Sequence, residues 1–464
     1  MSFDLVVRNG RVVTVADEFV GDIGIRAGRV AAVGEGLARG REEIDATGLL
    51  VLPGGVDAHC HIDEPPYLNA RLADGFAAAS RAAACGGTTT IVPFLNQLDG
   101  MSLREARKDY LAKARPSLID YSFHLLLKAG DREALKAELP DLLREGLRSV
   151  KIFMTYPGYQ MGDEAILDIM AAVSAVGGIV MVHAENGAAA RWNAARLAGD
   201  GRTGLSTFAA AYPTVIEREA VHRAISHAEL TRCRLMIVHV TSAEALEQIA
   251  WAKRRNLPVL GETCPQYLLG LGARLASDEW ETAKYLCSPP IRTHADAAAL
   301  WEGLSGGTLD ILSSDHCPYR FDGPDGKKAF GDVPDFRNVP PGLPGLETRL
   351  PLLFEEGVAK NRISARRFVE LTSAKPAMIY GLYPQKGTIA PGGDADIVLW
   401  QTGDPRRVEH ADLHDDCDYT PYEGMTLSAW PVVTLSRGER VWDKGWVSSA
   451  HGRGRYVEPR AGLS

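Results

Sequence analysis

The chain has 464 residues, 45% of them hydrophobic and 24% charged, which is typical of a globular protein with two or three domains. Its 51 Lys and Arg against 59 Asp and Glu give a net charge of −8, so no long-range positive field favours nucleic acid or an anionic membrane. No stretch approaches the ~20 apolar residues that span a bilayer, and the first residues lack the features of a secretion signal. The seven cysteines are scattered and form no CxxC pair, which favours a reducing, cytoplasmic setting.

Short alternating strands are predicted at both ends of the chain, from Phe3 to Ile44 and from Gly387 to Val447. Neither end is long enough to form a good core alone, so we expect them to pair into one small domain. Between them, β-branched runs alternate with Ala-rich and Glu/Arg-rich helical stretches, the pattern of strand–helix units around a parallel sheet. The eight runs lie near Leu49, Thr88, Tyr121, Val150, Val180, Met236, Leu260 and Ile311.

This pattern predicts an α/β fold: a (β/α)8 TIM-like barrel with a small β-sandwich domain built from both chain ends. We expect residues 1–53 and 386–464 in the sandwich and residues 54–385 in the barrel. The loop from Tyr319 to Pro344 follows the eighth run and is rich in Gly, Pro and Asp. Because it is longer than most connections in compact domains, we expect it to cover the active site.

Metal-binding residue types stand at the ends of the predicted barrel strands. His59 and His61 are two residues apart, so both point to one face of an extended strand; by itself such a pair fits packed or solvated histidines equally well. His183, His239 and Asp315 end three further strands, at the carboxyl edge where barrel active sites are built. Imidazole nitrogens suit zinc and other first-row metals. Four imidazoles and a carboxylate are more ligands than one tetrahedral ion needs, so the pattern predicts two divalent ions.

Lys151 lies in the fourth predicted strand, near the same edge. An ammonium 4 Å from a dication would feel roughly 8 kcal/mol of repulsion at an effective dielectric of 20, so a charged lysine cannot stay beside two metals. Reaction with carbon dioxide would turn it into a carbamate, whose two oxygens can bridge both ions. The alternative is a strand lysine that extends to solvent, which is the commoner fate of this residue type.

Ordered motifs run through nearly the whole chain and resemble the cyclic amidohydrolases of the dihydropyrimidinase and hydantoinase family, within the amidohydrolase superfamily. The motifs are PGGVDAHCH, ACGGTTTIV, VKIFMTY, MVHAENG, IVHVTSAEAL, GETCPQYLL, CSPPIR, SSDHCP and DYTPYEG. The resemblance implies a two-metal barrel, usually with zinc. Its implied ligands are His59, His61, His183, His239 and Asp315, bridged by N6-carboxylated Lys151.

The resemblance and the two-metal site together suggest a mechanism. Two dications can lower the pKa of a bridging water from 15.7 toward about 7, so a hydroxide attacks the ring carbonyl. Asp315 would act as general base and then general acid, passing the proton to the leaving nitrogen. Tyr156, which matches the family's tyrosine after the fourth strand, would donate its phenol to the developing oxyanion; an aromatic that packs on the barrel rim is the alternative.

Two further positions are implied to bind substrate. Main-chain atoms of the residue that matches Ser288 hold the cyclic amide in the family, so its side chain is expected to matter little. The family's Asn in an IPNG turn is replaced by Pro341 in VPPG. A carbonyl contact survives that replacement, whereas an N–H or amide contact is lost.

The predicted activity is hydrolysis of the cyclic amide bond of dihydropyrimidines or 5-substituted hydantoins to N-carbamoyl amino acids. Allantoinase is the alternative enzyme, because HIDEPP resembles that group in a short stretch. Dihydroorotase is disfavoured, since its relatives have an Arg where this chain has Asp63, whose charge would repel a substrate carboxylate. A non-catalytic scaffold like the collapsin response mediator proteins is disfavoured, because all six metal positions are filled. The resemblance also implies a homotetramer.

Overall fold

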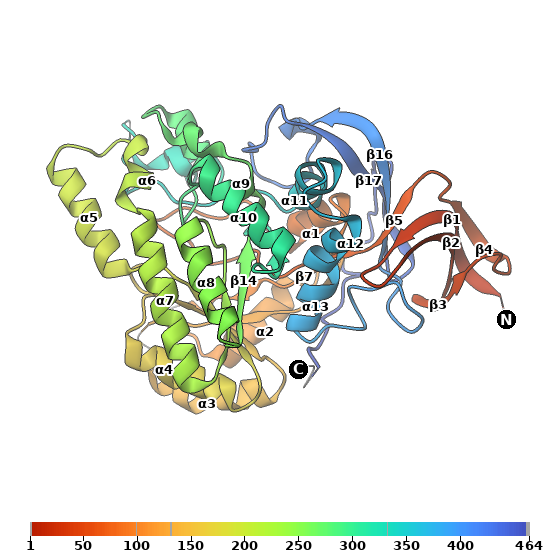
Figure 1. The fold of residues 1–464 in the computed structure, drawn as a ribbon, viewed down its shortest axis with the longest axis horizontal. Helices are drawn as coiled ribbons and strands as arrows, with labels where there is room; N and C mark the ends of the chain where they lie inside the picture. The colour runs from red at the N-terminus through yellow and green to blue at the C-terminus, as the bar shows by residue number, and fades with distance from the viewer. Residues whose placement is uncertain (1, 99, 130–131, 332, 461–464) are drawn as a thin grey trace.

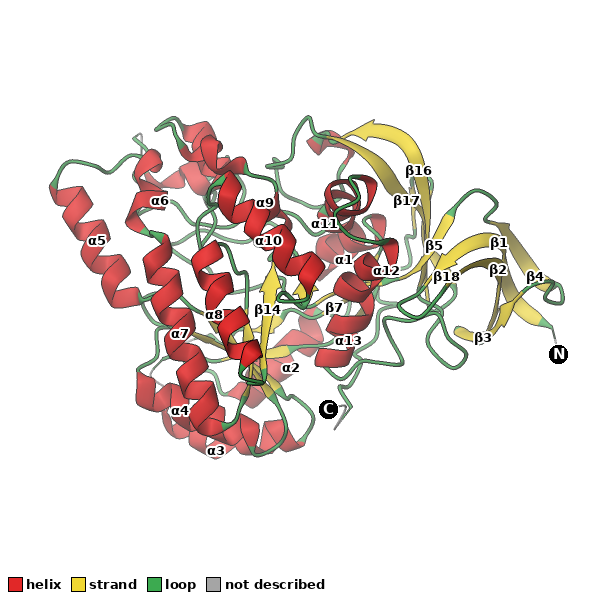
Figure 2. Cartoon of the chain, viewed as in Figure 1, coloured by secondary structure: helices red, strands yellow, loops and turns green. Residues whose placement is uncertain are grey.

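The computed structural model describes residues 2–98, 100–129, 132–331 and 333–460. These residues form a ring of parallel strands surrounded by helices, with a separate sheet domain on one side (Figures 1 and 2). In Figure 1 the sheet domain combines strands from the two ends of the colour scale, so the first and last parts of the chain lie together. The predicted barrel with a domain built from both chain ends is confirmed; the domain boundaries at 53 and 385 stay a prediction.

Eight strand positions make up the barrel, and all of the pairings within it are parallel. Pro93 interrupts the second position, because proline has no N–H to donate to a neighbouring strand. The hydrogen-bonded strands therefore fall into one set of seven and one set of three. They are β6 (Gly55–Asp57), β7 (Thr88–Ile91), β8 (Phe94–Leu95), β9 (Asp120–Tyr121), β10 (His124–Leu126), β11 (Ser149–Phe153), β12 (Ile179–His183), β13 (Arg234–Ile237), β14 (Val259–Thr263) and β15 (Ile311–Leu312).

Helices cover the outside of this ring, and several carry sequence-encoded starts. Ser102 and Thr293 each form a capping box with an acidic residue three positions later, which satisfies backbone N–H groups that have no partner within the helix. No helix among the described residues is both long and apolar enough to cross a membrane. The helices are α1 (Phe76–Cys85), α2 (Leu103–Lys113), α3 (Arg132–Arg144), α4 (Asp163–Ser174), α5 (Gly187–Gly199), α6 (Phe208–Ala211), α7 (Thr214–Thr231), α8 (Ala243–Arg254), α9 (Pro265–Leu268), α10 (His294–Gly306), α11 (Arg349–Leu353), α12 (Ala365–Val369) and α13 (Lys375–Ile379).

The first predicted barrel run is shared between the two parts of the molecule. Its first half, β5 (Leu50–Pro53), pairs with strands of the sheet domain, and its second half is β6 of the barrel. Gly54 joins the two halves at a point where a Cβ atom would lie 2.1 Å from the hydroxyl of Thr89. Only glycine lets the chain pass so close to the neighbouring strand.

The sheet domain is one continuous nine-stranded sheet with its own apolar core. Strand β5 connects its two halves, because it pairs with the first strand of the chain on one side and with β16 on the other. The remaining strands are β1 (Phe3–Val13), β2 (Glu18–Arg26), β3 (Arg29–Gly34), β4 (Gly40–Asp45), β16 (Ile397–Arg407), β17 (Thr426–Ser436), β18 (Glu439–Asp443) and β19 (Trp446–Val447).

A buried lysine ties this domain to the barrel. The Nζ atom of Lys386 lies 2.5 Å from Asp120 of β9, and 3.0 and 2.8 Å from Asp394 and Asp396, which precede β16. All four side chains are almost fully buried. The three carboxylates form a candidate metal-binding group, but the Lys386 ammonium already lies among them and the Arg437 guanidinium also pairs with Asp120, so protein cations compensate the buried charge.

The barrel closes between β6 and β15, its first and last strands, through backbone hydrogen bonds just beyond the strand ends and through side chains. The N–H of Asp315 donates to the carbonyl oxygen of His59 at 2.9 Å, and the N–H of His61 donates to the carbonyl oxygen of His316 at 2.7 Å. The guanidinium of Arg349 in α11 donates from Nη1 to the carbonyl oxygens of Val56 and Leu312, at 3.3 and 2.9 Å. Asp57 reinforces the same seam, because its Oδ1 accepts from the backbone N–H of Ser314 at 3.1 Å. The Arg349 Nε atom lies 3.6 Å from Asp57 Oδ2, so a fully buried ion pair holds the two ends of the ring together.

We predict that Arg349→Met destabilises the protein by about 3 to 5 kcal/mol, because it leaves the Asp57 carboxylate buried without its cation. The midpoint of urea unfolding, followed by tryptophan fluorescence, measures the loss. The matched control is Arg362→Met, which removes an exposed guanidinium paired with Glu356 and should change stability by about 0.5 kcal/mol or less. Equal midpoints for the two variants would contradict the role of Arg349 at the seam.

Candidate metal centre and active-site cavity

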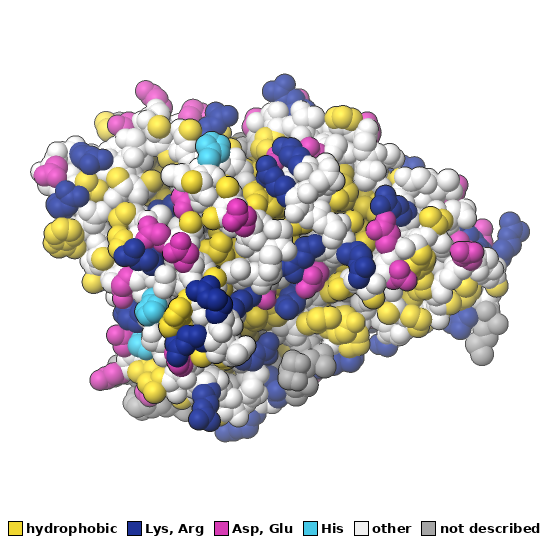
Figure 3. All heavy atoms as spheres, in the orientation of Figure 1, with side chains coloured by type: hydrophobic (Ala, Val, Ile, Leu, Met, Phe, Trp, Pro, Cys, Tyr) yellow, Lys and Arg dark blue, Asp and Glu magenta, His cyan; other side chains and the backbone are white. Residues whose placement is uncertain are grey.

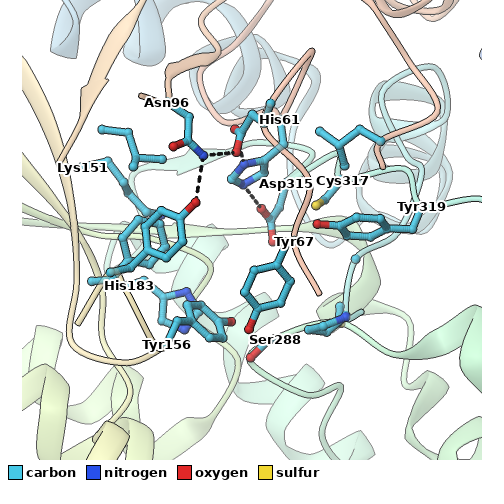
Figure 4. Close-up of a pocket in the computed structure, with 18 of the residues that line it drawn as sticks. His61, Tyr67, Asn96, Lys151, Tyr156, His183, Ser288, Asp315, Cys317 and Tyr319 are labelled. Atoms are coloured by element: carbon cyan, nitrogen blue, oxygen red, sulfur yellow. Dashed lines mark hydrogen bonds and ion pairs between the residues drawn. The ribbon is translucent and has the colours of Figure 1, made fainter. Parts of the chain in front are cut away.

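All of the residues predicted for the metal centre converge on one mouth of the barrel. His59 and His61 follow β6, Lys151 lies in β11, His183 ends β12, His239 follows β13, and Asp315 follows β15. Because the strands are parallel, their carboxyl ends meet at the same edge. Figure 4 shows His61, Lys151, His183 and Asp315 around a single cavity, which His239 also lines.

One group of donor atoms surrounds Asp315. Its Oδ1 lies 3.2 Å from Nε2 of His59 and 3.4 Å from Nε2 of His61. Two imidazole nitrogens and a carboxylate oxygen at these separations can all reach one cation, since metal–nitrogen and metal–oxygen bonds are about 2 Å long. The three side chains form a candidate metal-binding group.

A second group faces the first. The rings of His183 and His239 are 4.4 Å apart, and Nδ1 of His239 is buried without a hydrogen-bond partner among the described residues. A buried imidazole with an unused nitrogen is costly unless a cation or another ligand occupies it. Lys151 lies close to both groups, with its Nζ 3.4 Å from Nε2 of His59. The donor set therefore fits a divalent metal centre.

Burial sets the protonation of these groups. It lowers the pKa values of His59 and His239 well below the usual value, so both imidazoles are neutral and can bind a metal. It also lowers the pKa of Lys151 to about 8, although Asp315 and a nearby glutamate oppose the shift. Burial raises the pKa of Asp315, but His59, His61 and Lys151 outweigh it and hold this pKa below its ordinary value. Asp315 is therefore a carboxylate at neutral pH.

A carboxylate holds the far nitrogen of three of the histidines, and the sequence analysis did not identify any of them. Glu262 of β14 lies 2.6 Å from Nδ1 of His59, and Glu185 lies 2.6 Å from Nε2 of His183. Glu64 lies 2.6 Å from Nδ1 of His61. Such partners orient a ligating imidazole and increase its basicity. Glu185 and Glu262 stand at the ends of barrel strands, which is the signal that could have identified them, whereas Glu64 lies in the loop after β6 and has no such signal.

Three residues of the site have backbone conformations that are rare outside glycine. The φ angles are +69° for Tyr156, +40° for His239 and +50° for Asp315. Positive φ costs about 1 to 3 kcal/mol for residues with a Cβ atom and clusters at functional sites. The surrounding barrel therefore holds these three residues in a backbone conformation that an unconstrained loop would rarely adopt.

The predicted substrate-binding residues line the same cavity: Tyr156, Ser288 and Pro341. Burial raises the pKa of the Tyr156 phenol well above its usual value, so it stays a hydrogen-bond donor. That the Ser288 side chain matters little for substrate binding stays a prediction. The Ser288 hydroxyl donates to Glu185 at 3.1 Å, and Glu185 in turn contacts Nε2 of His183.

The long loop after β15 contributes to the cavity, as predicted. Tyr319, Pro341 and Gly342 are among the lining residues, and Figure 4 shows Tyr319 beside Cys317 at one side of the site. The loop therefore reaches the substrate cavity from the last strand of the barrel.

The carboxylate at the cavity wall is Glu64, not its neighbour Asp63. An oxygen of Asp63 accepts from the backbone N–H of Phe76 at 3.2 Å, at the start of α1, and Asp63 is not among the residues that line the cavity. Asp63 has a φ of +55°, which turns its side chain toward that helix. The argument against dihydroorotate-like substrates therefore depends on the wrong residue.

Two further histidines are engaged elsewhere. His124 has Nδ1 2.5 Å from the Ser149 hydroxyl and Nε2 3.0 Å from the Ala58 carbonyl. His316 has Nε2 3.0 Å from Asp74, while its Nδ1 accepts from the backbone N–H of Gly345. Both rings have structural partners on both nitrogens, so neither has a nitrogen left for a metal.

The comparisons with known proteins agree with this geometry. Residues 50–441 match the model of the amidohydrolase family. The chain is 41% identical to a D-hydantoinase of Streptomyces coelicolor, over 99% of both chains, and 40% identical to a D-hydantoinase of Rhizobium radiobacter, over 98% of this chain and 99% of that one. It is also similar to the crystal structure of a dihydropyrimidinase from Brevibacillus agri NCHU1002, with a TM-score of 0.94 and 39% identity over 98% of each chain.

A parallel barrel with a cluster of histidines and a carboxylate at its carboxyl edge defines a metal-dependent hydrolase. The chain belongs to the amidohydrolase family.

Proposed function

We propose that this amidohydrolase opens the cyclic amide bond of dihydropyrimidines or 5-substituted hydantoins and releases N-carbamoyl amino acids. The observation that carries the proposal is the arrangement of the metal centre and substrate residues around one cavity. Relatives of the same length that are named D-hydantoinase and D-phenylhydantoinase support it. Allantoinase remains the alternative, but none of the relatives described above carries that name. A non-catalytic scaffold is disfavoured, because all six metal positions are filled.

Two divalent ions, with zinc as the expected metal, would be held by the residues that converge on the mouth. When bound there, they would lower the pKa of a water toward about 7 and polarise the ring carbonyl. The unused Nδ1 of His239 and the two separate donor groups support two ions. The ligands are His59, His61, His183, His239, Asp315 and N6-carboxylated Lys151.

The surroundings of Lys151 support its carboxylation. The side chain is fully buried, and a pKa of about 8 leaves about a tenth of the amine neutral at pH 7, far more than an ordinary lysine has. A neutral amine attacks carbon dioxide, forms the N–C bond and loses a proton, which leaves a carbamate anion. The anion suits a position 3.4 Å from a metal-facing nitrogen of His59 better than an ammonium does.

The remaining steps belong to side chains of the cavity. The Asp315 carboxylate takes the proton of the attacking water and passes it to the ring nitrogen as the amide bond breaks. The Tyr156 phenol donates a hydrogen bond to the carbonyl oxygen as negative charge develops there. Backbone atoms of Ser288, and the carbonyl of Pro341, hold the ring in place.

A homotetramer in the cytoplasm is the proposed assembly and location. The family resemblance supports the tetramer. The seven cysteines, all of which are free thiols, support a reducing compartment.

The test of this function is ring opening by the purified protein after zinc and bicarbonate are supplied. Substrates are dihydrouracil, several 5-substituted hydantoins, allantoin, dihydroorotate and simple cyclic imides, with metal content measured on the same sample. We expect about two metal ions per chain and the highest kcat/KM on hydantoins or dihydrouracil. Well under one ion per chain and no ring opening would overturn the proposal, and a preference for allantoin would favour the alternative.

We predict that Lys151→Ala loses metal and activity, because the bridging anion is missing. Small carboxylic acids such as acetate should restore part of both, since they can replace the carbamate. Metal analysis and hydantoin hydrolysis with and without acetate measure the rescue. Normal metal content in the unrescued variant would show that Lys151 does not bridge the ions.

We predict that Tyr156→Phe keeps its metal and lowers kcat by about 100-fold, because one oxyanion donor is lost. Metal content is the control, and steady-state kinetics on one hydantoin give the readout. Equal turnover by the variant and the wild type would exclude Tyr156 from the mechanism.

A further inference from the structure

Glu64 places a carboxylate in the wall of the substrate cavity. Its Oε1 lies 2.6 Å from Nδ1 of His61, and its Oε2 accepts from Nδ2 of Asn96 at 2.9 Å. The side chain is 11% exposed. A carboxylate can accept about four hydrogen bonds, so two of its acceptor positions remain after these contacts.

Asn96 orients the Glu64 carboxylate in the same wall. Its Nδ2 donates to Glu64 at 2.9 Å and to the hydroxyl oxygen of Tyr159 at 3.2 Å, and dashed lines start from Asn96 in Figure 4. The side chain is almost fully buried, and its Oδ1 has no hydrogen-bond partner among the described residues. Because Oδ1 is itself buried, Asn96 acts on the cavity through the Glu64 carboxylate that it holds.

Apolar and aromatic side chains line the same cavity as Glu64. Pro65, Tyr67 and Leu72 follow Glu64 along the chain and line the cavity with it. Lys151 is the single lysine or arginine among the described lining residues, and it belongs to the metal centre. The Lys128 ammonium is 5.3 Å from the ring centroid of Tyr159, and Lys128 does not line the cavity.

We propose that Glu64 is a specificity-determining residue that selects substrates whose exocyclic group carries N–H donors, such as a carboxamide or a ureido group, and excludes those with a carboxylate. The proposal rests on the proposed function, because it names the substituent of the same ring substrate. A hydrogen bond to a carboxylate is stronger than one between neutral groups. A substrate carboxylate would instead face a like charge in a partly dry wall.

Three hydantoins of nearly equal size test this selection: the 5-carbamoylmethyl, 5-carboxymethyl and 5-isobutyl compounds. They differ in a terminal amide, carboxylate or dimethyl group and share the same ring and branching. For the metal-loaded wild type we expect kcat/KM to be about 100-fold higher for the amide than for the carboxylate compound. Glu64→Gln keeps the size of the side chain and an acceptor for His61, and should lower this ratio at least about 10-fold.

The matched control is Glu262→Gln. Glu262 also holds a metal-facing histidine through a 2.6 Å contact, but it is fully buried and does not line the cavity. This variant should lose metal affinity by about 10- to 100-fold, with the amide-to-carboxylate ratio unchanged. Because each ratio is taken within one variant, a general loss of metal or activity cancels.

The outcomes separate this inference from the proposed function. If the wild type opens the isobutyl compound but Glu64→Gln leaves the ratio unchanged, the selection by Glu64 is wrong and the function stands. An equal fall of the ratio in both variants would also overturn it, since the effect would then come through the metal centre. If the wild type opens none of the three compounds, it is the proposed function that fails.

Discussion

The buried ion pair of Arg349 and Asp57 is the contact on which the site depends. Strands β6 and β15 are the two ends of the barrel, and these side chains bridge them by bonding to the Val56 and Leu312 carbonyls and the Ser314 N–H. His59 and His61 follow one of these strands, and Asp315 follows the other. The backbone N–H of Asp315 also donates to the His59 carbonyl at 2.9 Å. Together these contacts close the ring and set the distances between the donor atoms, 3.2 and 3.4 Å.

Closing the ring also gathers titratable side chains in a buried region, where charged groups lose their hydration. Four imidazoles and a lysine are brought into a region with little water, where burial disfavours each charged form. At His61 alone of these groups Glu64 and Asp315 outweigh burial and raise the pKa to about 9. Glutamates reduce this desolvation cost at His59, His61 and His183. Each accepts a hydrogen bond from the ring nitrogen that faces away from the cluster of donor atoms. His239 has no such partner on Nδ1. A buried imidazole nitrogen without a partner is typical of a cation-binding site and not of histidines packed in a core.

The convergence of the six residues proposed for the metal centre was predictable from the sequence for a simple physical reason. Parallel strands bring their carboxyl ends to one edge, and side chains two residues apart share a face, so strand-end residues such as His183 and Asp315 converge once a barrel is assumed. The supporting carboxylates were not predictable in the same way. Glu64 and Asp63 are adjacent and chemically alike, and only the backbone conformation decides that Asp63 faces α1 while Glu64 faces the cavity.

By itself the sequence determined the order of strands and helices, the positions that can hold a metal and the family to which the chain belongs, because these depend on local periodicity and on motifs. The tertiary structure decided which carboxylates contact His59, His61 and His183, and that the Ser288 hydroxyl contacts Glu185. It also decided that the first predicted barrel run divides at Gly54 between two sheets. These are contacts between segments far apart in the chain, and they follow from strand register and close packing, which no local pattern records.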